Sequence, residues 1–499
     1  MEVIVHWFVH QFYIRIIRAL LSGVPRIPMS ACGRGLLILL LLFPVMLSAQ
    51  TRWKGTFSSS WSNSANWTAG VPNANVDAII GDAAFTGIFY PVISYSASCK
   101  SLTVGAGTNA VLTISQSLTV AGDLVIGSGS TISQRGVTLT LKGNWTNSGT
   151  YSTSSTNAKV TFAGTTQSIG GASVTTFRKL TIGVGSTTTQ NVNMTVSGTF
   201  AVNGTFVPAD VATPVLISGA ATTSVAAGGI LHVKAAAIGG NYGLTGTVTL
   251  AAGSIVDYSG TLVNQTVRNT LTYSTLRISG TGIKTLGGNL NALNATTATA
   301  GKIEVLAGTL DLSTFTANRG TTVPGGGLTV VNNAILKIGG VNTFPVNYAT
   351  VSLGLTSTVE YNGTNQSVAV QPYGNLTLSA GSGAAIKTMP ATALTISGNL
   401  TSTIGSGTSV SFTAASNITV SGNVNIGAAT TFNGGSFTTT TTSNWVNNGV
   451  FSGGTGTVVL AGGGASISGT GTHNFNNLTV AATNITAAAG YCHYSLRKF

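Results

Sequence analysis

The chain has 499 residues, but only 6% of them are charged, against roughly 25% in typical globular proteins. Hydrophobic residues make up 43%, which is enough to bury a core and excludes the low-hydrophobicity, high-charge composition of disordered chains. The net charge of +13 is scattered as single residues rather than clustered beside aromatics, so we expect no nucleic-acid binding. The three cysteines show no spacing typical of a metal site, and the sequence predicts no cofactor.

The N-terminal residues have the pattern of an export signal. Residues 36–47, LLILLLLFPVML, form an apolar run that follows a basic residue and precedes the small residues Ser48 and Ala49. The run is shorter than the roughly 20 residues that span a membrane, so we expect no membrane span in the mature chain. We interpret residues 29–49 as a signal peptide and residues 1–28 as an extension upstream of the true start; a second amphipathic or spanning segment is the alternative for residues 1–28.

Three of the six tryptophans, Trp53, Trp61 and Trp67, lie close together just after the predicted cleavage point. One interpretation is an aromatic platform that contacts glycans by stacking on sugar rings. The other is a cap, because a stack of repeats needs an atypical first unit over the open end of its core, and tryptophan covers a large area per residue. We favour a Trp-rich N-terminal cap over residues 50–90.

One stretch of sequence occurs four times downstream of this cap. Each copy has an apolar triplet that leads to a glycine, then an aromatic residue and a second apolar triplet that begins with leucine. The copies are Val160–Ile182, Val256–Ile278, Val359–Leu378 and Val458–Val480. Their glycines are Gly164, Gly260, Gly363 and Gly462, which are 96, 103 and 99 residues apart. A constant long period of this kind is the signature of a repeat protein.

Shorter patterns predict the geometry of the repeats. Triplets such as LTV and LTI alternate with Gly, Ser and Asn, and sustained helical periodicity is missing after residue 50. Asn144-Trp145-x-Asn147-x-Gly149 recurs 300 residues later as Asn444-Trp445-x-Asn447-x-Gly449. We therefore predict an all-β fold, a right-handed parallel β-helix (β-solenoid), over residues 91–490. It would contain about four degenerate units of roughly 100 residues with coils of about 22, and residues 491–499 form an aberrant tail.

The sequence contains no motif of a known catalytic site. Glycosidases need two carboxylates about 5–10 Å apart, and stacked coils could bring distant acids together. The acids after the signal are Asp77, Asp82, Asp123, Asp210, Asp257, Glu304, Asp311 and Glu360. Asp77 with Asp82 and Glu304 with Asp311 are the close pairs, and neither has a recognisable motif. Asp257 and Glu360 occupy the same place in their repeats, where we expect a solvated strand face, and we predict no enzyme activity.

The tryptophan-rich opening of residues 53–72, the NLTV-type coils and the Gly-x-x-Gln…Leu-Thr-Ile units together resemble a family. The chain is similar, over roughly residues 51–490, to large exported repeat proteins of Gram-negative bacteria of the Bacteroidetes type, which look like adhesin or autotransporter-passenger β-helices. The resemblance implies a structural role outside the cell and supplies no catalytic residues.

The resulting expectation is a non-catalytic secreted or cell-surface repeat protein, adhesin-like, at the outer membrane or beyond it. Its partners would be glycans or neighbouring cell surfaces. The alternatives are a polysaccharide-degrading lyase or glycosidase on the same fold, because a fold alone does not determine function, and a carbohydrate-binding module whose tryptophans hold sugar.

Overall fold

The computed structural model describes residues 49–290, 301–320, 325–481, 483 and 486–487. The chain divides into two compact units, residues 1–49 and residues 50–499. The predicted extension, nearly all of the predicted signal peptide and the predicted tail lie outside the described residues. None of the helices among the described residues has the length and apolar character to cross a bilayer.

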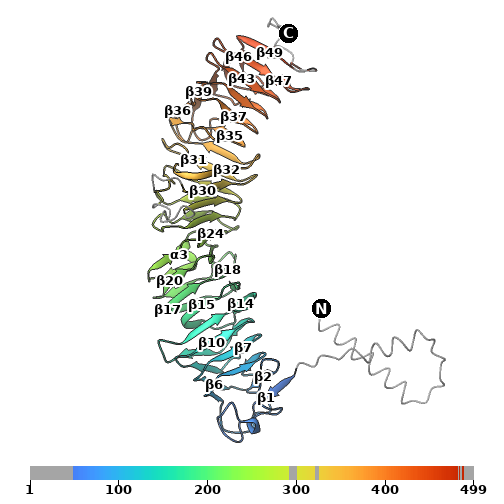
Figure 1. The fold of residues 1–499 in the computed structure, drawn as a ribbon, viewed down its shortest axis with the longest axis vertical. Coiled ribbons are helices and arrows are strands. Elements are labelled where there is room, and N and C mark those ends of the chain that lie inside the picture. The colour runs from blue at the N-terminus through green and yellow to red at the C-terminus, as the bar shows by residue number, and fades with distance from the viewer. Residues whose placement is uncertain (1–48, 291–300, 321–324, 482, 484–485, 488–499) are drawn as a thin grey trace, which may run out of the picture. The chain divides into compact units, whose positions relative to one another are not determined.

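The second unit is a parallel β-solenoid of about 19 turns, so the predicted all-β solenoid class is confirmed. Each strand pairs in parallel with a strand of the previous or next coil, and Figure 1 shows the strands stacked one above another from β1 to β49. Within the described residues, the helical elements are one α-helical turn, α3 (Ile238–Asn241), and one 3-10 turn, η1 (Ser64–Asn66). Short strands with alternating buried and outward side chains explain this, since an apolar-Thr-apolar triplet buries its first and third residues.

Three sheets form the N-terminal part of the solenoid. The 14-stranded sheet contains, in order, β1 (Gln50–Arg52), β2 (Asp77–Ile80), β5 (Leu102–Val104), β8 (Leu124–Ile126), β11 (Trp145–Asn147), β14 (Thr166–Gly170), β16 (Thr187–Gln190), β18 (Thr205–Pro208), β21 (Ile230–Val233), β24 (Ile255–Tyr258), β26 (Thr275–Ile278), β28 (Lys302–Val305), β30 (Gly325–Val330) and β32 (Tyr348–Leu353). The 4-stranded sheet contains β3 (Val92–Ile93), β6 (Val111–Ile114), β9 (Thr131–Gln134) and β12 (Thr150–Thr153). The 10-stranded sheet contains β4 (Ala97–Cys99), β7 (Leu118–Val120), β10 (Thr138–Leu141), β13 (Lys159–Phe162), β15 (Thr175–Ile182), β17 (Met194–Val202), β19 (Ile217–Gly219), β20 (Thr222–Val225), β22 (Tyr242–Leu244) and β23 (Val248–Leu250).

Three further sheets form the C-terminal part. The 11-stranded sheet contains β25 (Gln265–Val267), β27 (Ile283–Leu286), β29 (Thr309–Asp311), β31 (Ile335–Ile338), β33 (Thr358–Tyr361), β35 (Asn375–Leu378), β38 (Leu400–Ser402), β41 (Val424–Ile426), β44 (Trp445–Asn447), β47 (Ser466–Ser468) and β50 (Thr486–Ala487). The 6-stranded sheet contains β34 (Gln366–Ser367), β36 (Ala384–Thr388), β39 (Ser409–Thr413), β42 (Thr430–Asn433), β45 (Val450–Ser452) and β48 (Thr472–Asn474). The 5-stranded sheet contains β37 (Leu394–Ile396), β40 (Ile418–Val420), β43 (Thr438–Thr441), β46 (Thr457–Leu460) and β49 (Asn477–Val480).

The order of the sheets divides the solenoid into three segments. From β3 to β14, the first three-sheet segment, the chain visits the 4-, 10- and 14-stranded sheets in each coil. From β15 to β33, the two-sheet segment, each coil uses the 14-stranded sheet and one other, first the 10-stranded and then the 11-stranded sheet. From β35 to β50, the second three-sheet segment, the chain cycles through the 11-, 6- and 5-stranded sheets. The cross-section of the solenoid therefore changes along the chain.

Each copy of the sequence repeat occupies one coil, and its two apolar triplets pair with each other. Val160 pairs with Leu180, Val256 with Leu276, Val359 with Leu376 and Val458 with Leu478. The repeat glycines lie where the previous coil passes closely. A Cβ atom at Gly164 would be 1.9 Å from Lys142 O, and one at Gly462 would be 1.7 Å from Thr442 O. Only glycine fits there, because any side chain would overlap the backbone of the coil below.

The two Asn-Trp motifs of the sequence mark equivalent coils of the two three-sheet segments. Trp145 in β11 and Trp445 in β44 are both completely buried. After each tryptophan the chain continues through strands of the same order, β12 and β13 in one case and β45 and β46 in the other. The two coils are built alike, although they belong to different sheets.

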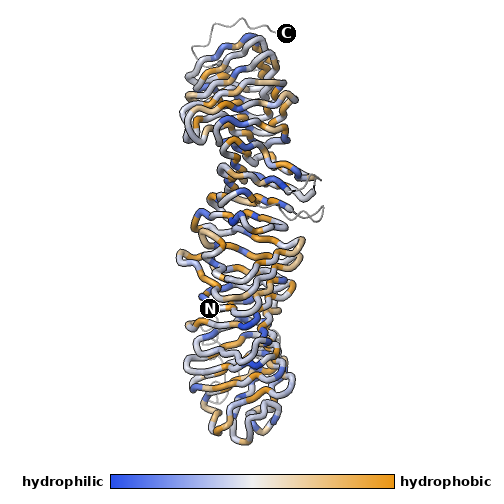
Figure 2. Tube along the Cα trace, turned by 90° about the vertical axis from the view of Figure 1, so that its left-hand side faces the viewer, coloured by the Kyte–Doolittle hydropathy of each residue, from blue (hydrophilic) through white to orange (hydrophobic). Residues whose placement is uncertain are grey.

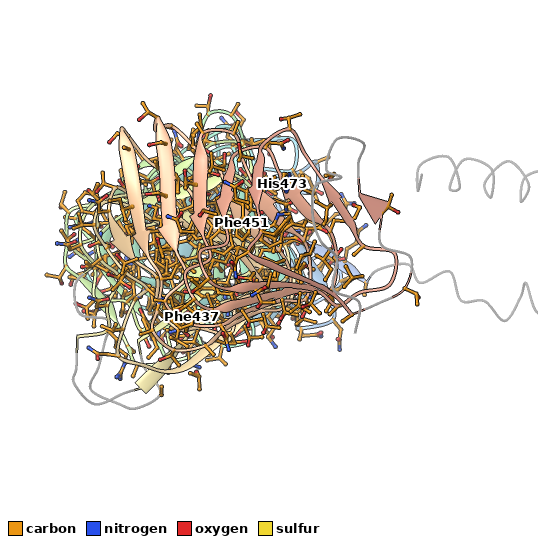
Figure 3. The ribbon with its side chains drawn as sticks, turned by 90° about the horizontal axis from the view of Figure 1, so that it is seen from above. Phe437, Phe451 and His473 are labelled. Carbon is orange, nitrogen blue, oxygen red and sulfur yellow. The ribbon has the colours of Figure 1, made fainter. Side chains whose placement is uncertain are left out.

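The core is a stack of inward side chains, and apolar and polar residues alternate along the coils (Figure 2). In the 6-stranded sheet one inward row consists of Phe412, Phe432, Phe451 and His473, each in register with the next. Figure 3 looks down onto these coils and labels Phe451 and His473 of this row, with Phe437 of the same region. Burial lowers the pKa of His473, whose ring continues the aromatic row in its neutral form.

Candidate functional site

The three tryptophans of the cap lie inside its core. Trp53, Trp61 and Trp67 are 0%, 3% and 2% exposed, and their rings pack edge to face with centroids 4.8–5.0 Å apart. The indole nitrogen of Trp53 donates to Phe89 O at 2.7 Å, and that of Trp67 donates to Trp61 O at 2.8 Å. A buried indole has no free face on which a sugar ring could stack, so this arrangement favours the cap interpretation over the glycan platform.

An open aromatic side chain does lie next to these tryptophans. A cavity of about 190 Å³ is lined by Trp61, Ser62, Val71, Pro72 and residues 94–98. Tyr95 on its rim is 73% exposed, and Ser94 and Ser96 flank it. An exposed ring beside hydroxyl groups suits a sugar better than the buried indoles do. Sequence reasoning missed Tyr95 because a single tyrosine between serines has no motif.

Most of the eight acids that could have formed a catalytic pair are instead ion-paired one by one. Asp77 pairs with Lys100, Asp82 with Arg52, Asp210 with Lys234, Glu304 with Arg277 and Glu360 with Lys337, while Asp257 accepts from Ser279 Oγ and lies 3.6 Å from His232 Nδ1. The other two accept backbone N–H groups, Asp123 from Asn144 and Asp311 from Ser313. The close sequence pairs do not form a shared carboxylate site: Asp77 and Asp82 have different partners, as do Glu304 and Asp311.

Four ionisable side chains form a row on the 14-stranded sheet. His232, Asp257, Arg277 and Glu304 occupy successive strands in register. Arg277 Nε donates to Glu304 Oε2 at 2.8 Å, and His232 Nδ1 lies 3.6 Å from Asp257 Oδ2. These residues are far apart in sequence, so only the stacking of coils brings them together. We call this row the charged ladder and treat it as the candidate site.

Asp257 corrects the expectation of a solvated strand face. It is 2% exposed, because the neighbouring coils cover it and Ser279 Oγ donates to both of its carboxylate oxygens at 2.8 and 2.9 Å. Glu360 at the equivalent place is half-buried, and Ser379 Oγ donates to it at 2.7 Å. The shared place in the repeat thus holds an acid that a serine of the next coil caps.

Serine, histidine and aspartate meet in the ladder without the geometry of a catalytic triad. Ser259 Oγ lies 2.8 Å from His232 Nδ1, the same nitrogen that faces Asp257. A relay needs the serine and the carboxylate on opposite nitrogens of the ring. Burial lowers the pKa of His232, Asp257 opposes this, and Lys234 and Arg277 add to the lowering. The polar groups of this cluster therefore serve as hydrogen-bond and charge partners for one another.

The ladder also fails as a pair of free carboxylates. Asp257 and Glu304 are two strands apart, which corresponds to about 9.6 Å between their backbones. This distance is near the upper limit for an inverting glycosidase. Arg277 lies between the two acids and binds Glu304, so the space in which a water and a glycosidic bond would have to fit is occupied by a guanidinium group.

A second polar device, buried at the corners of the solenoid, recurs with the sequence repeat. In three copies a glutamine accepts from the repeat glycine: Gly164 N donates to Gln167 Oε1, Gly260 N to Gln265 Oε1 and Gly363 N to Gln366 Oε1. The amide nitrogen of Gln366 donates to Ile338 O and Asn342 O of the previous coil, both at 2.8 Å. We call this arrangement the glutamine corner. It gives Gly363 N and Asn342 O a partner and adds a second hydrogen bond to Ile338 O, which also accepts from Asn362 N at 2.9 Å.

A buried lysine covers two of these corners from the next coil. Lys284 pairs in register with Gln265, and Lys387 pairs with Gln366. Lys387 Nζ donates to Gly363 O, Thr364 O and Gln366 Oε1 at 2.6–3.0 Å, and both lysines are completely buried. Burial lowers the pKa of Lys387 to about 8, against the opposing effect of Glu360. Thr188 takes the lysine's place over Gln167.

Among the residues that the structure describes, His, Cys, Asp and Glu side chains form no group of three that could hold a metal ion. No family model, curated protein or solved structure matches the chain.

Proposed function

We propose that the chain is a non-catalytic, exported structural repeat protein with an adhesin-like role at the cell surface. The observation that carries this is the state of the acids: each is held by a basic side chain, a serine hydroxyl or a backbone N–H, and Arg277 lies between Asp257 and Glu304 in the charged ladder. A continuous solenoid needs no active site to act as a spacer, and its long faces suit contact with extended partners.

The outward faces support this role through their chemistry. On the 10-stranded sheet Thr119, Thr140, Thr161 and Thr181 form a row in register. Rows of uncharged hydroxyl groups at the spacing of strands can form many weak hydrogen bonds with glycans or with a neighbouring surface.

The enzyme alternative is tested with purified chain and a panel of neutral and acidic polysaccharides. We expect no release of reducing or unsaturated ends. Cleavage that disappears in both Asp257→Asn and Glu304→Gln would overturn the proposal and assign the charged ladder as an active site. Export is tested separately, by N-terminal sequencing of chain recovered from the culture medium and the cell surface, where a mature start at Gln50 is expected.

A carbohydrate-binding role has one specific observation in its favour, the cavity beside Tyr95. If this cavity holds a sugar, Tyr95→Ala reduces retention on immobilised glycans by about five- to tenfold, because stacking on an aromatic ring is worth roughly 1 kcal/mol or more. The matched control is Tyr90→Ala, which removes a second exposed tyrosine that does not line the cavity. Equal retention by Tyr95→Ala and the unmodified chain would remove the cavity from consideration.

A further inference from the structure

The 10-stranded sheet ends in the middle of the solenoid with an unpaired edge. Its last strands are β22 and β23, which pair on one side with β19 and β20. No described strand pairs with their other side, because the next coil passes from β24 to β25 in the 11-stranded sheet. An open edge presents a row of backbone donors and acceptors to any extended chain that can reach it.

The hydrogen bonds of β23 show which groups face the opening. Thr247 O accepts from Thr223 N at 2.8 Å, and Ala251 N donates to Val225 O at 3.0 Å, both toward the previous coil. Peptide groups alternate in direction along a strand, so the N–H and C=O groups of Val248 and Leu250 point to the open side. These four groups are positioned to bond with one additional parallel or antiparallel strand.

The core is also incompletely closed at this place. None of the side chains of β22 and β23 is fully buried, whereas the inward residues of β20 and β24 are. Tyr242 and Leu250 pack at the margin of two separate core clusters, one on each side of this point. A cavity of about 350 Å³, in the size range of ligand sites, is lined by residues 248–250 of β23 and residues 270–272 of the following coil.

We propose that this opening, the β23 slot, binds an extended peptide segment of a partner protein, which adds a strand to the 10-stranded sheet. The slot consists of the open edge of β23 and the adjoining cavity. Residues 242–250 contain no charged residue and no proline, the usual protections of a sheet edge. The segment that fits is uncharged, and every second side chain is apolar and enters the cavity between Leu250 and Leu271.

The direction of the edge determines the kind of occupant. The open edge of β23 faces the next coil of the solenoid, because its other edge pairs with β20 of the previous coil. Residues 270–272 of that next coil line the same cavity. A single extended chain can enter such a slot. A strand embedded in a folded sheet cannot, because its own neighbours would collide with the next coil. A second copy of the solenoid, whose strands are embedded in sheets throughout the described residues, is therefore a poorer occupant than a free segment.

Hydrogen exchange of the full chain, read at single amides, tests the slot without a mutation. In the free protein we expect Val248 and Leu250 amides to exchange much faster than those of Thr249 and Ala251, which bond to the previous coil. Strong protection of Val248 and Leu250 in dilute protein would overturn the proposal, since the edge would already be paired. Protection that appears only as the concentration of the chain rises would reassign the slot to a second copy and also overturn it.

Binding is tested with a fluorescein-labelled peptide that has the sequence of residues 245–253, TGTVTLAAG, followed by fluorescence polarisation. The matched probe TGTPTLAAG lacks one N–H and should bind at least about tenfold more weakly. Val248→Lys should weaken binding of the first peptide by about tenfold or more, because the peptide would bury an unpaired ammonium group. Leu262→Lys, at an exposed position of the next coil outside the cavity, is the control.

Peptide binding by the unmodified chain, with protection of the Val248 and Leu250 amides, supports the proposal. Equal binding of both peptides, equal binding by Val248→Lys and Leu262→Lys, or no protection on saturation with peptide each overturns it. Circular dichroism of both variants establishes that they are folded. If Val248→Lys does not fold, the exchange experiment on the unmodified chain still decides.

Discussion

The first three-sheet segment and the two-sheet segment solve the same packing problem with different chemistry. Between residues 92 and 170 no charged side chain is buried. Between residues 175 and 361, in its described part, three are: Asp257, Lys284 and Arg319. The two-sheet segment also holds the charged ladder and the tyrosine pair Tyr258–Tyr273, whose hydroxyls are 3.0 Å apart. Of these two segments, only the two-sheet segment buries charged side chains; the next one along the chain, Lys387, lies in β36 where the second three-sheet segment begins.

The two segments differ because their coils offer different numbers of backbone hydrogen-bond partners. In a three-sheet coil most peptide groups bond to the coil above or below. In a two-sheet coil a loop replaces one strand, and its carbonyl groups have no ladder. Lys284 Nζ donates to Gly260 O at 2.8 Å and also to Thr281 O, both in such loops. Side chains that donate from inside the core replace the missing sheet, since unpaired buried carbonyls are costly.

Among these tests, the largest loss of stability is expected when a glutamine corner is removed. Gln366→Leu removes the acceptor of Gly363 N and the donor to Asn342 O, and it deprives the ammonium of Lys387 of one partner. We expect a loss of roughly 3–5 kcal/mol, typical for breaking a buried charged network. Gln167→Leu should cost less, about 1–3 kcal/mol, because Thr188 rather than lysine covers that corner. Urea unfolding of both variants measures the difference, and equal losses would contradict this role of the lysine.

The pH dependence of stability measures the cost of burying the charge of Lys387. Burial lowers the pKa of Lys387 to about 8, from roughly 10.4 in an unfolded chain. Between these values the unfolded state binds more protons, so stability rises with pH from about 8 to 10.4, by on the order of 3 kcal/mol. Below pH 8 the full cost of the buried charge is present. Lys387→Met should remove this slope.

The slope is obtained from urea midpoints at several pH values, as the difference between the unmodified chain and Lys387→Met. Taking the difference cancels the opposite effect of buried tyrosines such as Tyr151, whose pKa burial raises and which destabilise the fold above pH 10. A slope that is the same in both proteins would mean that Lys387 is neutral or solvated in both states.

The tryptophans of the two Asn-Trp motifs offer a smaller comparison, between the three-sheet segments. Trp145 Nε1 donates to Thr175 Oγ1 at 3.1 Å, whereas Trp445 Nε1 is buried without a hydrogen-bond partner. Trp145→Phe should therefore cost about 1–3 kcal/mol more than Trp445→Phe, which removes an unsatisfied donor. Thermal unfolding of the pair measures it. The reverse order would show that ring volume, not the nitrogen, controls both sites.

The smallest effect concerns one turn that both three-sheet segments share. Gly129 has φ +72°, and Ala429, its equivalent in the second three-sheet segment, has φ +57°. The left-handed conformation costs a residue with a Cβ about 1–2 kcal/mol, partly offset by the greater chain entropy of glycine. Ala429→Gly should stabilise the protein by about 0.5–1 kcal/mol, and Gly129→Ala should destabilise it by at least as much. Unfolding midpoints of the two variants check both signs.

Much of the architecture could be predicted from the sequence because it depends on local pattern. Alternating triplets predict short half-buried strands, Gly and Asn predict turns, and the recurring short motifs predict a coil of about 22 residues. The repeat glycines could be found as well, since Gly164 and its equivalents are constant in sequence. Only the structure shows why these positions require glycine, which is that the backbone of the previous coil passes too close for a side chain.

The candidate site could not be predicted in the same way. His232, Asp257 and Arg277 have no motif, and they meet only because their strands are stacked in register. That register depends on the lengths of the coils, which vary along the chain. The coil that separates Val359 from its partner Leu376 is much shorter than the one that separates Leu276 from Ile303. The same reasoning explains the error at Asp257, which is outward on its strand yet covered by its neighbours.

The sequence by itself determined that the chain is a stack of short parallel strands, because strand and turn preferences act over a few residues and recur along the whole chain. Tertiary structure alone decided which sheet each strand joins, where three sheets become two and where one sheet is left with an open edge. Those outcomes depend on contacts between residues one coil apart, and the corners between strands can differ in length from coil to coil while the strands stay in register.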